Sequence, residues 1–142
     1  MRSTFGAQKV SDAILLVARI LLVLLFVIFG WKKLTGFGGT VAYFSHSGVP
    51  LPSFAAVIAV MMEFFVGLTI ALGFLTRPLA LLMALYTLGT ALLGHQFWNL
   101  TGAAQMENEI NFLKNIGLIG GFLLLYLSGA GRYSLDDKID VV

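Results

Sequence analysis

Four long apolar stretches alternate with short polar or glycine-rich segments along the chain. A helix rises about 1.5 Å per residue, so about 20 residues cross the hydrocarbon layer of a membrane. The pattern therefore predicts four membrane-spanning helices, at residues 11–31, 53–75, 78–95 and 109–128. Ser11 or Asp12 is the expected N-cap of the first helix. The glycine-rich connection before the second helix leaves room for a short interfacial helix at residues 40–48.

The composition agrees with a membrane location. Of 142 residues, 58% are hydrophobic and 11% are charged, and the mean hydropathy is +0.93. A soluble globule of this length could not bury so many large apolar side chains. We therefore expect an all-α integral membrane protein, a single domain over residues 1–142 that forms a four-helix bundle with the lipid bilayer as its surroundings.

The charges and the missing cysteines exclude several function classes. The net charge is +2, but the cations are scattered and form no basic run, so nucleic acid is not an expected partner. Without cysteine the chain itself cannot exchange disulfides, hold an iron–sulfur cluster or bind zinc through sulfur. His46 and His95 have no second ligand at metal spacing, so no metal site is expected.

The positive charges differ between the two ends of the predicted bundle. Four spans place both termini on one side, and cytoplasmic segments of membrane proteins are enriched in lysine and arginine. The terminal side collects Arg2, Lys9, Arg77, Arg132 and Lys138, whereas the other side has Lys32, Lys33 and, at its edge, Lys114. This bias favours a cytoplasmic location for both termini.

Polar residues inside the spans are the candidate functional residues. The fourth span begins with Asn111, Lys114 and Asn115 on one helical face, and the stretch that follows, at 116–131, has only 16 residues. The polar cluster must therefore lie at or just inside one edge of the bilayer. The first span has a similar stripe, formed by Asp12, Arg19, Phe26, Gly30 and Lys33.

Glu63 is expected near the middle of the second span, where an ionised carboxylate is costly without a partner. The positions favour a buried constellation of Arg19, Glu63 and Lys114, walled by Asn111 and Asn115. Three interpretations remain open. Lys114 extends to the head groups, the Arg19–Glu63 pair only fixes helix register, or the cluster forms a pocket for a polar head group or quinone ring in which Glu63 handles a proton.

Several segments in this order and spacing resemble the DoxX family of small bacterial membrane proteins. They are "ARILLVLLFVIFGWKKLTGFGGT", "YFSHSGVP", "EFFVGLTIALGFLTRPLALLMALYTLGTALLGH", "FLKNIGLIGGFLLL" and "GAGRYSLD". The resemblance implies a four-helix bundle in the bacterial inner membrane. Some relatives are linked to quinone-coupled sulfur oxidation or to redox-stress complexes with soluble partners. No set of catalytic residues can be carried over, and the lack of cysteine disfavours sulfur chemistry here.

Two functional hypotheses follow, and whether the protein is an enzyme stays open. The leading one is an accessory component of redox or quinone-linked metabolism, an oxidoreductase component with no defined reaction and with quinone as its candidate cofactor. The alternative is a non-enzymatic membrane carrier or scaffold that binds a small amphiphile or a partner protein.

The charge bias predicts the orientation of the protein. A reporter that works only in the cytoplasm should be active when it is fused after Val142. A tag inserted between Gly38 and Gly39 should be labelled from outside the membrane. A reporter at Val142 that reads as periplasmic would show that the orientation is reversed.

Overall fold

The computed structural model describes residues 5–140, and within this range the regular elements are all helical. Four stretches are long and apolar enough to cross a membrane, at Gln8–Thr35, Pro52–Leu72, Thr76–Asn99 and Gly102–Ser128. The predicted all-α fold with four spans is confirmed. The elements are α1 (Phe5–Thr35), α2 (Phe37–His46), α3 (Pro52–Val60), the π-helical turn η1 (Met61–Val66), α4 (Gly67–Leu72), α5 (Thr76–Gly94), the 3-10 turn η2 (Phe97–Asn99), α6 (Gly102–Ser128) and α7 (Leu135–Lys138).

The first helix starts earlier than the sequence predicts. α1 begins at Phe5, so neither Ser11 nor Asp12 is its N-cap. No proline interrupts the residues between Phe5 and Asp12, and the Asp12 carboxylate is used elsewhere. Its Oδ1 accepts a hydrogen bond of 3.4 Å from the backbone N–H of Arg132. Asp12 is therefore a buried residue inside α1 that faces the C-terminal segment.

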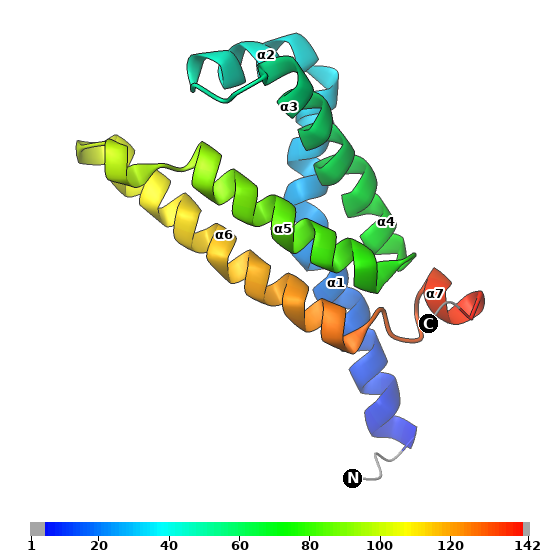
Figure 1. The fold of residues 1–142 in the computed structure, drawn as a ribbon. Coiled ribbons are helices and arrows are strands. Elements are labelled where there is room, and N and C mark those ends of the chain that lie inside the picture. Colours follow the sequence, from blue (N-terminus) through cyan, green and yellow to red (C-terminus); the bar gives the residue numbers. More distant parts are fainter. Residues whose placement is uncertain (1–4, 141–142) are drawn as a thin grey trace.

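The spans form two antiparallel pairs. α1 packs against the line of α3, η1 and α4, and α5 packs against α6 along its length. Figure 1 shows the start of α1 and the short α7 at the same end of the bundle, with α2 at the opposite end. α2 confirms the expected short helix between the first two spans and lies beside α3.

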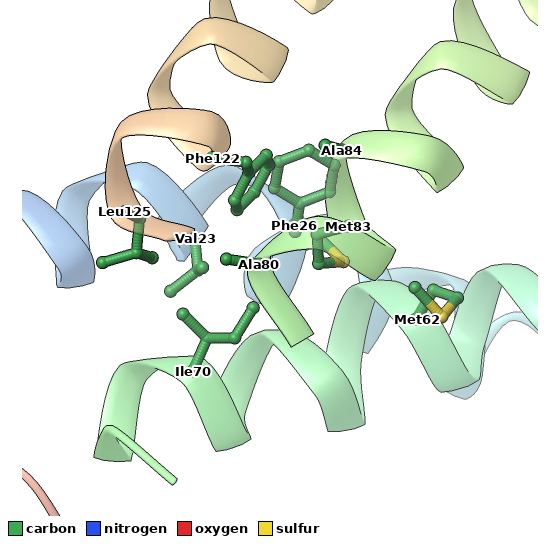
Figure 2. Packing of buried hydrophobic residues seen from close by; sticks show 9 residues of the cluster. All are labelled: Val23, Phe26, Met62, Ile70, Ala80, Met83, Ala84, Phe122 and Leu125. Carbon is green, nitrogen blue, oxygen red and sulfur yellow. The ribbon is translucent and has the colours of Figure 1, made fainter. Parts of the chain in front are cut away.

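A small apolar core joins all four spans. It consists of Val23 and Phe26 of α1, Met62 of η1, Ile70 of α4, Ala80, Met83 and Ala84 of α5, and Phe122 and Leu125 of α6. Figure 2 shows most of these side chains gathered between the four ribbons, with Met62 further along its helix. The Phe26 and Phe122 rings lie 5.5 Å apart at their centroids, so they link α1 to α6. Most other large apolar side chains of the spans are exposed, as expected for a surface that contacts lipid.

Glycine allows α1 to approach its neighbours closely. A Cβ atom at Gly30 would lie 2.5 Å from the backbone nitrogen of Phe64, which is closer than real Cβ atoms come. A Cβ at Gly67 would lie 3.1 Å from a methyl group of Val27. Small residues at helix contacts are the usual means by which membrane helices pack. Gly30 thereby fixes α1 against the turn that carries Glu63.

Candidate functional site

Glu63 lies on the irregular part of the second span. Residues Met61–Val66 form a π-helical turn, which widens the backbone and is frequent at functional sites. Glu63 is 8% exposed and belongs to the buried face of this turn. A carboxylate that is removed from water needs hydrogen-bond partners, because its desolvation is costly.

Two donors on two other helices meet this carboxylate. Lys33 Nζ, near the end of α1, lies 2.7 Å from Oε2 of Glu63, and the Tyr86 hydroxyl of α5 donates to Oε1 at 2.7 Å. Both carboxylate oxygens are therefore bonded, one by a cation and one by a neutral hydroxyl. We call Lys33, Glu63 and Tyr86 the Glu63 cluster.

Arg19 occupies a separate site near the terminal end of the bundle. Its side chain is 1% exposed, and its guanidinium donates to backbone carbonyls rather than to a carboxylate. Nε and Nη2 each donate to the Ala71 carbonyl at 3.2 Å, Nη2 donates to Tyr133 at 2.8 Å, and Nη1 donates to Ala130. Arg19 thus joins α1 to the end of α4 and to the segment after α6.

The predicted pairing of Arg19, Glu63 and Lys114 is wrong, and the register of α1 against the second span explains why. Glu63 faces Gly30, which is 11 positions beyond Arg19 and therefore about 16 Å further along α1. The prediction assumed an offset near 10 Å from a Glu63 at mid-span. Glu63 is the twelfth of the 21 residues of its own span, Pro52–Leu72, but this point lies opposite the part of α1 near Thr35, within reach of Lys33 but not of Arg19.

The polar residues at the start of the fourth span differ in burial. Lys114 is exposed, and its Nζ donates to Oδ1 of Asn111 at 3.0 Å. Asn115 is 6% exposed, and its side-chain amide donates to Oγ1 of Thr90 at 3.2 Å. Asn115 therefore links α6 to α5, whereas Lys114 is exposed on α6 and Asn111 is half-buried. Neither of these two hydrogen bonds involves Glu63.

Sequence reasoning placed Lys33 on the buried stripe of α1 but did not pair it with Glu63. The usable signal was Gly30, because a glycine one turn before Lys33 on the same face marks the closest contact with a neighbouring helix. Tyr86 was missed. Its signal is weaker, since a tyrosine within a span needs a partner for its hydroxyl only when it is buried.

The chain is similar to known proteins over most of its length. The DoxX family model matches residues 14–96. The inner membrane protein YphA of Escherichia coli K12 is 52% identical over 134 residues, which cover 94% of each chain. The inner membrane protein YqjF of the same organism is 44% identical over 129 residues, or 91% of this chain and 94% of YqjF. The chain belongs to the DoxX family. No solved structure matches it.

The part of this DoxX protein that matches the family model contains both polar sites on α1. Arg19, Lys33, Glu63 and Tyr86 all lie within residues 14–96, whereas Lys114 and Asn115 lie beyond them. The Glu63 cluster is thus built entirely from the matched region. Its chemistry is a buried, hydrogen-bonded carboxylate with an ammonium and a phenol in contact.

The Lys33–Glu63 pair predicts a stability cycle. Glu63→Gln should destabilise this DoxX protein because it leaves the Lys33 ammonium without its counter-charge. Loss of one partner of a buried ion pair costs about 3–5 kcal/mol, and we expect the lower end because the Lys33 side chain is 23% exposed. The double variant Glu63→Gln/Lys33→Gln should be more stable than Glu63→Gln alone.

Unfolding in mild detergent measures this cycle, with Glu109→Gln on the exposed surface of α6 as the matched control. Additive effects of the two substitutions would show that the ion pair contributes no coupling energy.

Proposed function

We propose that this protein is an inner-membrane accessory component of quinone-linked redox metabolism, and that the Glu63 cluster binds the polar ring of a quinone. The printed names of both relatives describe inner membrane proteins, which supports the same location for this chain. The observation that carries the proposal is the convergence of Lys33 and Tyr86 on one buried carboxylate.

The cluster has the hydrogen-bonding groups that a quinone ring requires. A quinone offers carbonyl acceptors, and the reduced quinol offers hydroxyl donors. The Lys33 ammonium has N–H groups beyond the one on Glu63 and can donate to a carbonyl, the Tyr86 hydroxyl can donate to it when it turns away from Oε1 of Glu63, and Glu63 can accept from a hydroxyl. When bound, the quinone would supply the capacity to carry electrons and protons, while the protein residues orient the ring and hold a proton at the Glu63 carboxylate.

Aromatic side chains next to the cluster suit a planar ring. The centroids of Trp31 and Phe64 lie 5.5 Å apart, and those of Phe64 and Phe65 lie 5.1 Å apart. Trp31 and Phe65 are exposed. Stacking and edge-to-face contacts with such rings stabilise a flat ligand. A ring could reach the cluster from this aromatic surface.

The position of the cluster also suits a molecule with a polar head and an apolar tail. Glu63 faces Gly30, five residues before the end of α1 at Thr35. The polar groups therefore lie about 7 Å from that end of the helix. A head group bound there would leave its tail against the exposed apolar side chains of the spans. The Lys33 side chain is 23% exposed and that of Glu63 is 10% exposed, so approach is not closed off.

The quinone content of protein purified from native membranes tests the proposal. The wild type should retain quinone, and Tyr86→Phe should retain several-fold less because it removes one donor without changing the ring. Tyr126→Phe is the matched control, since Tyr126 is 39% exposed on α6, away from the cluster. Extraction and quantification of bound quinone provide the measurement.

Quinone content at the level of a detergent blank, or equal content in wild type and Tyr86→Phe, would contradict the proposal. Retention of a different amphiphile, or solute flux in liposomes without electron transfer, would instead support the carrier or scaffold function. The same purification identifies any protein partner that remains bound.

A further inference from the structure

A second polar site lies at the terminal end of the bundle, apart from the Glu63 cluster. A cavity of about 290 Å³ opens where α1, the start of α5, the end of α6 and the C-terminal segment meet. A neighbouring cavity of about 300 Å³ shares Asp12, Arg132 and Asp137 with it. The two cavities adjoin at these residues, and we call them together the Asp12 cavity.

Two buried polar side chains in this cavity lack full hydrogen bonding. Thr76 is 1% exposed, and its hydroxyl oxygen has no partner among the residues that the structure describes. Asp12 is 8% exposed, and its carboxylate accepts one long bond of 3.4 Å from the Arg132 N–H. The Thr76 hydroxyl oxygen is closed off from the cavity, whereas the Asp12 carboxylate lines the cavity with only this one long bond and can accept further hydrogen bonds from a ligand.

The charges of the cavity are mixed. Arg77 and Arg132 line it together with Asp12, Asp136 and Asp137. Asp136 is already engaged, because its two oxygens accept the N–H groups of Leu75 and Thr76 at 2.7 and 2.9 Å. Arg77, Arg132, Asp12 and Asp137 therefore remain for a ligand, and Lys9 also lines the second of the two cavities. A purely anionic ligand would meet the aspartates, and a purely cationic one would meet the arginines.

The mixed charges favour a ligand with both a positive and a negative group, and the location of the cavity indicates which zwitterion this is. The apolar run of α5 begins just after Arg77 and Pro78, and that of α6 ends just before Ser128. Head groups lie at the ends of such apolar runs, and basic pockets between membrane helices bind lipid phosphates there. A single arginine guanidinium can also donate to two phosphate oxygens at once.

We propose that the Asp12 cavity binds the head group of a zwitterionic phospholipid that has a primary ammonium, such as phosphatidylethanolamine. Arg77 and Arg132 hold the phosphodiester, and Asp12 with Asp137 accepts hydrogen bonds from the ammonium. The cavity volume is at the lower end of the range for small-molecule sites, which suits a head group.

Lipid retention by delipidated, full-length protein in a non-ionic detergent tests this assignment. Phosphatidylethanolamine should be retained more strongly than phosphatidylglycerol, which is anionic, and than phosphatidylcholine, whose ammonium has no N–H. Native mass spectrometry counts the bound lipid, and the rise in unfolding temperature reports binding independently. Equal retention of the three lipids would overturn the proposal.

Variants separate the two halves of the head group. Arg77→Gln should weaken retention of all three lipids by about tenfold, as expected for the loss of one charge-assisted hydrogen bond. Asp12→Asn and the exposed Asp137→Asn should each reduce the preference for phosphatidylethanolamine over phosphatidylcholine. Lys32→Gln and Glu109→Gln are exposed charge controls away from the cavity and should change nothing.

The exposed positions Arg77 and Asp137 keep the test decisive if Asp12→Asn unfolds the protein. Unchanged lipid selectivity in Asp137→Asn together with unchanged retention in Arg77→Gln would refute the site. Soluble phosphoethanolamine and inorganic phosphate distinguish the source of the phosphate. If either stabilises the protein as much as the lipid at equal concentration, a soluble ligand replaces the phospholipid and the proposal is wrong.

Discussion

The burial of one guanidinium organises the terminal end of this protein. An ionised arginine removed from water is costly unless its N–H groups are bonded. Arg19 meets this condition with carbonyls from Ala71, Ala130 and Tyr133. Carbonyls in the last turn of a helix lack partners within the helix, and the helix dipole favours a cation there. The end of α4 and the segment after α6 must therefore fold around Arg19.

The end of α4 and the C-terminal segment pack closely together next to Arg19. Gly73 adopts a positive φ of 73°, and a Cβ there would lie 2.5 Å from Ser134 Cβ and 3.1 Å from the Arg19 guanidinium carbon. Asp136 then bonds the N–H groups at the start of α5, and its own N–H donates to the Gly73 carbonyl at 2.8 Å. The segment "GAGRYSLD" thus closes the bundle over Arg19 and at the same time forms one wall of the Asp12 cavity.

One face of α1 carries polar residues of the Asp12 cavity, of the Arg19 site and of the Glu63 cluster. Asp12, Arg19, Phe26 and Gly30 are buried along it, and Lys33 is half-buried at its far end. From the terminal end onward, this face contributes to the Asp12 cavity, the carbonyl contacts of Arg19, the apolar core and the Glu63 cluster. The apolar core separates the two charged centres, so Arg19 and Glu63 act independently rather than as a pair.

The sequence was sufficient for the number and approximate position of the spans and for the polar stripe of α1, because both depend on local periodicity. It was not sufficient for the partner of Glu63. That partner depends on the register of α1 against the second span, and the pattern of one helix does not encode its register against another. The π-helical turn, the role of Tyr86 and the folding of the C-terminal segment around Arg19 also arise from contacts between distant segments.

Hydrogen exchange of Arg19→Lys in lipid nanodiscs tests the central role of Arg19 most directly. Lysine keeps the charge but cannot donate to three carbonyls in the fixed geometry of a guanidinium. We predict faster exchange at residues 71–76 and 129–137, while the region around Gly30 and Glu63 stays protected. Unchanged exchange in the terminal segments, or equal loosening at both ends of the bundle, would contradict the account.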